Sequence, residues 1–140
     1  MPRIPPFIAF AFAALLAGCA AMPSMAPAAH CPAGREQAVS DLLYFGTAKP
    51  GGTVSLKEWS DFLWEVVTPR FPKGFTAWQA YGQWKPDNGD VQREVSYVLN
   101  IVHAEDEITE AGIRAVVEAY KQRFHQESVL RVSSPSCVSF

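Results

Sequence analysis

The hydrophobic positions of this chain follow two different periods. Between residues 55 and 67, apolar residues recur every three or four positions, as on one face of a helix. Ser55 and Glu58 have the spacing of a capping box, and Pro69 is expected to end this helix. A second helix is predicted after the acidic segment 104–107, with Arg123 and Phe124 at its end. Its expected buried positions are Ile113, Val116, Val117, Tyr120 and Phe124.

Four other segments have the pattern of strands. They are residues 42–46, 75–84, 91–103 and 128–133. The first is a short continuous apolar run, typical of a buried strand, and the third alternates apolar with polar residues. Residues 49–52 predict a turn after the first strand, and Asp87 to Asp90 predict a hairpin turn between the second and third.

The order of these elements is strand, helix, strand, strand, helix, strand. That order predicts an α+β fold of the ferredoxin-like β-α-β-β-α-β type, with a four-stranded antiparallel sheet and two helices on one face. Each half of such a fold needs a right-handed crossover. The first and last strands are then expected to be antiparallel neighbours.

The N-terminus has the pattern of an export signal. Arg3 is followed by an apolar run from residue 7 to 16, which is too short for a spanning helix. The run ends in Leu16-Ala17-Gly18-Cys19, which resembles the bacterial lipobox, in which the cysteine is lipidated and becomes the new N-terminus. An ordinary signal peptide cut near Ala20 or Ala21 is the alternative.

These observations predict a signal peptide at residues 1–18, a lipidated Cys19 with an Ala/Pro-rich tether at residues 19–40, and one domain at residues 41–140. Such an anchor places the protein in the bacterial cell envelope. Ala20 follows the cysteine, and the resemblance to Gram-negative lipoproteins then favours the outer membrane, facing the periplasm.

Composition supports one small globular domain. The chain has 140 residues, of which 49% are hydrophobic and 19% charged, and its net charge is -2. A weakly acidic chain lacks the basic footprint of a nucleic-acid-binding protein, so no nucleic acid is expected as partner. The expected partners are the membrane, through the lipid, and either a second copy or another envelope protein.

Two cysteines remain if Cys19 carries lipid. In an oxidising compartment, Cys31 and Cys137 are expected to form a disulfide. In the predicted fold both would emerge at the same end of the sheet. A metal site with His30, His103 or His125 is the alternative, but these residues lack the spacing of a zinc site, and no metal is expected.

Polar residues along the middle strands are the candidate binding surface. Apolar positions of the third strand should face the helices, and its polar positions should face away. The residues expected together on this open face are Gln79, Tyr81, Gln83, Glu94, Ser96 and Asn100, with Arg131 joining them. A solvated surface, a ligand groove and a dimer interface all fit this pattern.

A few other residues invite a chemical interpretation. Arg70 and Arg123 follow the two helices, where cations are favoured at C-termini, but they could also form an anion-binding pair. The tryptophans are expected mostly in the core, with Trp64 out of phase and the best candidate for an exposed aromatic. His103 could titrate near neutral pH, but no nucleophile motif surrounds it.

Two longer runs carry a family resemblance. Thr68-Pro69-Arg70-Phe71-Pro72-Lys73-Gly74-Phe75 and Arg123-Phe124-His125-Gln126-Glu127-Ser128-Val129-Leu130-Arg131-Val132 are similar to segments of the DUF3574 family, small exported bacterial proteins of unknown function. The resemblance covers roughly residues 41–132. It implies the domain type and no catalytic residue.

The sequence therefore predicts an envelope lipoprotein that binds a partner or ligand and is not an enzyme, without cofactor. No catalytic constellation stands out among its residues. A small enzyme of the dimeric α+β barrel type, using the open sheet face, is the alternative, on analogy of fold alone.

Overall fold

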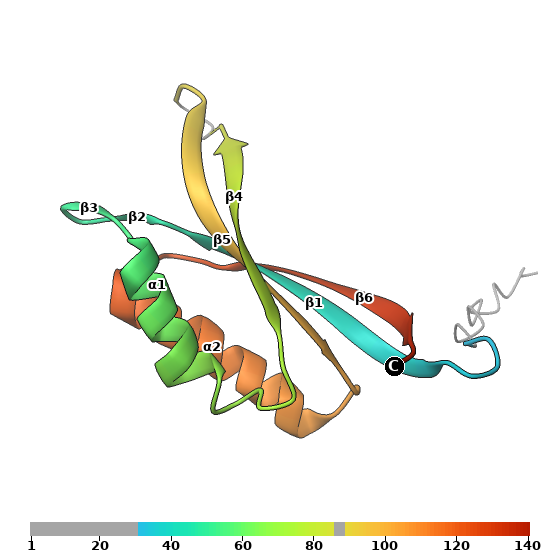
Figure 1. Cartoon of the computed structure of the whole chain (residues 1–140). Coiled ribbons are helices and arrows are strands. Elements are labelled where there is room, and N and C mark those ends of the chain that lie inside the picture. Colours follow the sequence, from blue (N-terminus) through green and yellow to red (C-terminus); the bar gives the residue numbers. More distant parts are fainter. Residues whose placement is uncertain (1–30, 86–88) are drawn as a thin grey trace, which may run out of the picture.

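A computed structural model describes residues 31–85 and 89–140 of the chain. Its main elements are β1 (Glu36–Gly46), α1 (Leu56–Phe62), β4 (Thr76–Trp84), β5 (Gln92–His103), α2 (Glu107–Phe124) and β6 (Leu130–Val138). The four long strands form one antiparallel sheet in the order β4-β5-β1-β6. Both helices lie against the same face of that sheet (Figure 1). The predicted ferredoxin-like α+β fold is confirmed.

Local sequence signals account for the helix ends. Ser55 Oγ accepts a hydrogen bond from the Glu58 amide at 3.3 Å, and the Glu58 carboxylate accepts one from the Ser55 amide at 2.9 Å, so the predicted capping box is present. The helix then widens into the π-helical turn η1 (Leu63–Val67), which Thr68 closes by donating to the Leu63 carbonyl. At the start of α2, the Asp106 carboxylate accepts from the Thr109 amide at 2.8 Å.

The predicted turn at residues 49–52 forms a small hairpin. Its two short strands are β2 (Ala48–Lys49) and β3 (Gly52–Thr53). Gly51 has a φ of 82° and Gly52 a φ of 150°, in the region where glycine is favoured. Val54 donates back to the Thr47 carbonyl at 2.7 Å and leads the chain into α1. The hairpin thus connects the centre of the sheet to the helical layer.

An aromatic core fills the space between the sheet and the helices. Trp59 of α1 stacks on Tyr97 of β5 with ring centroids 4.8 Å apart, and Phe45 meets Tyr120 edge-on at 4.6 Å. Stacked and edge-to-face pairs add to the stabilisation from burial. The predicted buried face of α2 is confirmed, with Val117 only partly buried. The other large side chains fully buried here include Phe62, Leu43, Leu99, Ile101 and Val116.

The outer two strands extend further than the hydrophobic pattern predicts. β1 begins at Glu36, opposite Val138, so the predicted domain start at residue 41 is wrong: residues 36–40, assigned to the tether, belong to the sheet. β6 likewise runs past the predicted end at residue 133. These ends mix polar and apolar residues without a clear alternation, so hydrophobic periodicity does not reveal them. A disulfide joins Cys31 to Cys137, where β1 begins and β6 ends.

Several predictions fall on residues 1–30, outside the described residues: the signal peptide, Cys19 and most of the tether. The centre of the predicted hairpin turn, Asp87 and Asn88, is also outside them. No helix in the described part of the chain combines the length and the apolar character needed to cross a membrane.

Candidate functional site

The strand register divides the side chains of the sheet into two sets. Leu43 lies opposite Leu99, and Phe45 opposite Tyr97, and all four belong to the core beneath the helices. Because side chains alternate along a strand, odd-numbered residues of the four long strands face the helices. Even-numbered residues face the other way. We call this second surface the open face, since no described element covers it (Figure 1).

An apolar row crosses all four strands on the open face. Trp78 pairs with Val98, Val98 with Tyr44, and Tyr44 with Leu130. Within the chain Val98 is fully buried by its neighbours, but Trp78 is 43% exposed and Leu130 61%. Leu42 and Val132 lie side by side in the next row, and Val132 is also exposed. Large apolar side chains gathered in this way mark interaction surfaces.

The predicted polar surface is split between the two faces. Glu94, Ser96 and Asn100 lie on the open face as expected. Gln79 pairs with Tyr97, Tyr81 with Val95 and Gln83 with Arg93, so the side chains of these three β4 residues lie on the opposite face, and the prediction that joined them to Glu94 is wrong. The hairpin register decides this, because a shift of one residue moves a whole strand to the other face.

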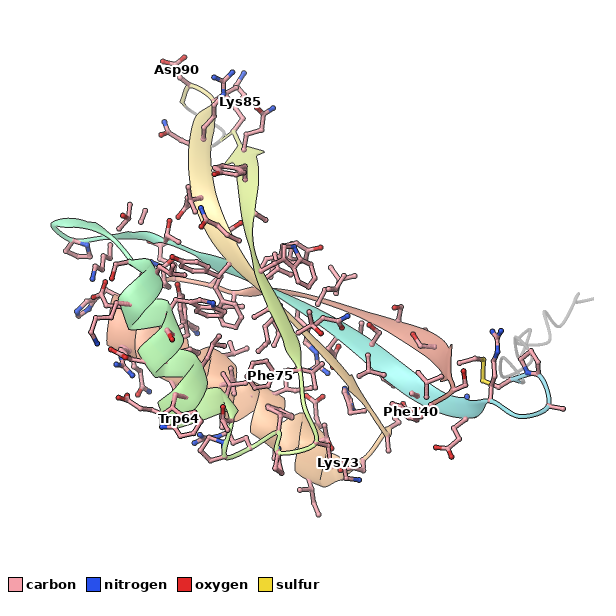
Figure 2. The ribbon with its side chains drawn as sticks, in the orientation of Figure 1. Trp64, Lys73, Phe75, Lys85, Asp90 and Phe140 are labelled. Atoms are coloured by element: carbon pink, nitrogen blue, oxygen red, sulfur yellow. A yellow bond between two sulfur atoms is a disulfide. The ribbon has the colours of Figure 1, made fainter. Side chains whose placement is uncertain are left out.

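On the open face, β4 contributes its even-numbered residues in place of Gln79, Tyr81 and Gln83. Trp78, expected in the core, is on the open face, whereas Trp59 is buried and Trp64 is 74% exposed on the outer side of the helical layer, as expected (Figure 2). The open face is therefore more apolar than the sequence predicts.

The three β4 residues line two hollows, and Glu94 contributes to the walls of both. A groove of about 830 Å³ runs between the β2–β3 hairpin, the start of α1 and β5, and Gln79, Arg93 and Glu94 are in its wall. Tyr81 and Gln83 line a shallower hollow of about 510 Å³ nearby. The Glu94 carboxylate accepts hydrogen bonds from the Thr47 and Ala48 amides, at 2.6 and 2.7 Å. These two bonds hold it against the backbone at the start of the β2–β3 hairpin.

Arg70 and Arg123 have separate partners. Arg70 Nη1 donates to the Val66 carbonyl at 2.6 Å, the interaction expected of a cation at a helix C-terminus. Arg123 Nη1 donates to the Glu65 carboxylate at 2.6 Å, and its guanidinium lies 5.6 Å from the Phe124 ring. The two arginines thus have different partners, and no contact in the described part of the chain joins them into an anion-binding pair.

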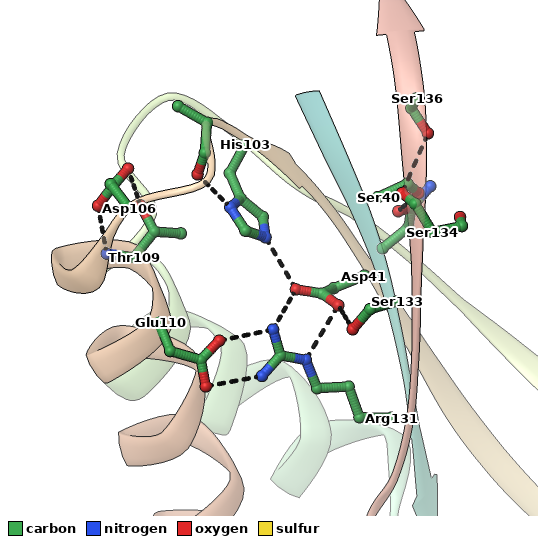
Figure 3. Close-up of polar contacts among 12 residues, drawn as sticks. Ser40, Asp41, His103, Asp106, Thr109, Glu110, Arg131, Ser133, Ser134 and Ser136 are labelled. Atoms are coloured by element: carbon green, nitrogen blue, oxygen red, sulfur yellow. Dashed lines mark hydrogen bonds and ion pairs between the residues drawn. The ribbon is translucent and has the colours of Figure 1, made fainter. Parts of the chain in front are cut away.

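A buried polar network lies under the N-terminal half of α2 (Figure 3). Asp41, in the centre of β1, is fully buried on the helix-covered face. It accepts hydrogen bonds from Arg131 Nε at 2.9 Å, from Arg131 Nη2 at 2.7 Å, from His103 Nε2 at 2.8 Å and from the Ser133 hydroxyl. Arg131 also binds Glu110 of α2 through both Nη atoms, at 2.9 and 2.7 Å.

The network sets the charge of its members. Burial raises the pKa of Asp41, but hydrogen bonds from Arg131, Ser133 and His103 and the charge of Arg131 outweigh it and lower this pKa to about 2. Hydrogen bonding to Arg131 likewise lowers the pKa of Glu110, and the two carboxylates raise the pKa of Arg131. Two carboxylates therefore stay ionised around one guanidinium.

His103 completes the network through both of its ring nitrogens. Its Nε2 faces the Asp41 carboxylate, and its Nδ1 lies 2.6 Å from the Ala104 carbonyl oxygen. Each ring nitrogen therefore has a hydrogen-bond partner within the chain. The arrangement joins β1, β5, β6 and α2.

This network was missed at the sequence level, where Arg131 was expected on the open face. Arg131 lies opposite Leu43, so it faces the helices. The sequence could have placed one member of the network, because Asp41 is two residues from the apolar Leu43 and therefore lies on the same face of the strand. Without the register, nothing identifies Arg131 and His103 as its partners. No group of three His, Cys, Asp or Glu side chains suited to a metal ion occurs at residues 31–85 and 89–140.

Comparisons with known proteins give a family and a fold. Residues 40–140 match the family described as "Protein of unknown function (DUF3574)". No functionally curated protein matches the chain. Among solved structures, a phage SAM lyase in complex with S-methyl-5'-thioadenosine is similar with a TM-score of 0.53 and 15% identity, over 79% of this chain and 94% of that one.

The same phage enzyme in its apo state is similar with a TM-score of 0.53 and 15% identity, over 76% of this chain and 91% of that one. At this identity the likeness concerns the fold. The arrangement of strands and helices is thus one that other proteins share.

Proposed function

The chain belongs to the DUF3574 family, and we propose that it is a lipid-anchored protein of the bacterial envelope whose domain binds a partner through the open face. Lipidation at Cys19 would hold it at the membrane, in the outer membrane and facing the periplasm. The tether would then present the folded domain, which begins with β1, at a distance from the lipid surface.

One observation carries the binding role: the apolar row of Trp78, Val98, Tyr44 and Leu130 crosses the open face. The central strand β1 shows the same feature in its sequence, because Leu42 and Tyr44 alternate with Leu43 and Phe45. Such a continuous apolar run is typical of a strand that is covered on both sides. In this chain the helices cover one side, and a partner would cover the other.

Binding fits the described groups better than catalysis does. Asp41 is hydrogen-bonded to both His103 and Arg131. The Glu94 carboxylate is held by two backbone amides. A reacting group must be free to meet its substrate, whereas a docking surface needs only apolar area and few charges.

Accessibility in the native membrane tests the binding role. Val132→Cys places a thiol on the open face, and Gln122→Cys places one on the exposed side of α2 as a matched control. In membranes from the native host, we expect a thiol reagent to label residue 132 at least about 10-fold more slowly than residue 122. Equal labelling of the two positions would contradict the proposal.

The anchor is tested separately. Cys19→Ser removes the sulfur that accepts the lipid, so we expect the precursor to remain uncleaved by the lipoprotein peptidase. Cleavage of this variant at the same bond, with continued association with membranes, would show that the anchor lies elsewhere. This result would leave the binding role of the open face untouched.

A further inference from the structure

We propose that the occupant of the open face is a second copy of this chain, packed sheet against sheet in a symmetric dimer. This inference rests on the proposed binding role and names its partner. In a two-fold dimer the same patch is present on both sides, so the face must be complementary to itself. The charge of the open face, the hydrogen bonds of its polar groups, its area and its twist are each consistent with such a self-complementary surface.

The open face carries almost no charge. Glu36 and Glu94 are the only charged side chains among the even-numbered positions of the four long strands, and they lie at opposite ends of the sheet. The Glu94 carboxylate already accepts hydrogen bonds from two backbone amides. A strongly charged partner would bury its charges against a neutral surface, which is costly. A second copy brings the same neutral centre, and the two glutamates of each copy lie at the ends of the sheet, away from that centre.

The polar groups near the centre are small and already paired. Ser40 Oγ on β1 donates to Asn100 Oδ1 on β5 at 3.0 Å, within the open face itself. A polar group that keeps its hydrogen bond loses little when water is removed, whereas an unpaired one does not. Serine can also both donate and accept, so Ser96 and Ser134 can pair with their equals on another copy.

The size and twist of the face favour a partner sheet. Four strands at about 4.8 Å spacing, each about nine residues long, cover on the order of 500–600 Å² before side-chain relief is counted. A specific interface buries about 800 Å² on each partner, so most of the open face must be covered at once. Two sheets with the same right-handed twist do this when they pack at about 30° to each other.

The β6 edge of the sheet is a poor alternative route to association. β6 is an edge strand and carries Pro135, opposite Val39 of β1. Proline has no amide hydrogen to offer to an added strand, and it is one of the devices that discourage edge-to-edge pairing. Association through the face is therefore favoured over continuation of the sheet past β6.

The test uses the full-length chain in its own membrane. Two copies with different epitope tags are expressed together, each with a photo-crosslinking amino acid in place of Val132. We expect a cross-linked species of twice the chain mass that carries both tags. Leu130→Asp should reduce its yield at least about 10-fold, because each dimer contains the change twice. Ile108→Asp, an equal change on the exposed side of α2, should not.

Each outcome separates the two proposals. A species that carries one tag and another mass would overturn the second copy and leave the binding role standing. The absence of any cross-linked species at residue 132 would overturn both. An intact Cys31–Cys137 disulfide in the Leu130→Asp variant shows that this variant has folded. If it has not folded, the test is repeated with Leu130→Ser, which adds no charge.

Discussion

The two faces of the sheet are built from the same strands, yet they treat polar and apolar groups in opposite ways. On the helix-covered face the aromatic core is closed by Trp59, Phe62 and Tyr120, and a buried carboxylate is tolerated because three residues bond to it. On the open face apolar side chains remain exposed, and the only charged side chains that the four long strands place there, Glu36 and Glu94, lie near its two ends. Within the chain, therefore, side chains are buried mainly on the face that the helices cover. The apolar composition of the strands, by contrast, is typical of a sheet that is covered on both faces.

The faces also differ in how they can be disturbed. The helix-covered face contains interlocked rings and ion pairs, so loss of one partner leaves a cavity or an uncompensated charge. The open face has no such neighbours within the chain. The four predictions that follow test this difference, beginning with the bridge that both faces share.

The disulfide should contribute most to stability. It closes a loop with a sequence separation of 106 at the end of the β1–β6 pair, on which both faces rest. Loop-entropy arguments give roughly 4–5 kcal/mol for a loop of this size. We expect the double variant Cys31→Ser/Cys137→Ser to lose about that much free energy of unfolding in urea. Wild-type protein with reductant is the control, and a loss below about 1 kcal/mol would contradict the expectation.

Breaking the buried network should cost less, but still a large share of the stability. Asp41→Asn removes the charge that Arg131 and His103 share, on the helix-covered face. Removal of one member of a buried ion pair costs about 3 kcal/mol or more. Glu110→Gln is the control, since Glu110 is partly exposed and should contribute under about 1 kcal/mol. Equal effects of the two variants would mean that Asp41 is not the centre of the network.

Acid should weaken the same network. The pKa of Asp41 is about 2 in the folded chain and 3.8 as a free side chain, so the folded state holds its proton less tightly. This stabilisation is present above pH 3.8 and is lost as the pH falls toward 2, which corresponds to about 2 kcal/mol. Unfolding measured from pH 6 to pH 2 should show this loss in the wild type. Asp41→Asn should lack it.

The smallest effect on stability is expected on the open face. Leu130→Ala changes a side chain that is 61% exposed within the chain, and at concentrations where the chain is monomeric it should cost under about 0.5 kcal/mol. Leu43→Ala, the matched change on the helix-covered face, should cost about 2–5 kcal/mol because Leu43 is fully buried. A large loss from Leu130→Ala in the monomer would show that the open face is stabilised from within the chain.

Much of the fold could be predicted from local signals. The capping box at Ser55 and Glu58 and the periodic apolar face of α2 specify their helices, because these signals act within a few residues. The strands of the hairpin were also recognisable. The ends of β1 and β6 were not, because polar and apolar residues are mixed there and no regular apolar pattern marks them.

The candidate site was less accessible to such reasoning. Glu94, Ser96 and Asn100 were placed on the correct face because β5 alternates clearly. The neighbouring strand was placed one residue out of phase, and this exchanged Gln79, Tyr81 and Gln83 for Trp78. In strand β4 both sets contain polar and aromatic residues, so periodicity could not choose between them.

The sequence by itself determined the element order and the two helix faces, since local hydrogen bonding and hydrophobic periodicity act along the chain. Only the tertiary structure decided which residues meet across strands. Asp41, His103 and Arg131 are brought together by register, and so is the apolar row of the open face. The physical reason is that strand pairing joins positions up to a hundred residues apart, and one step of register exchanges the two faces of a strand.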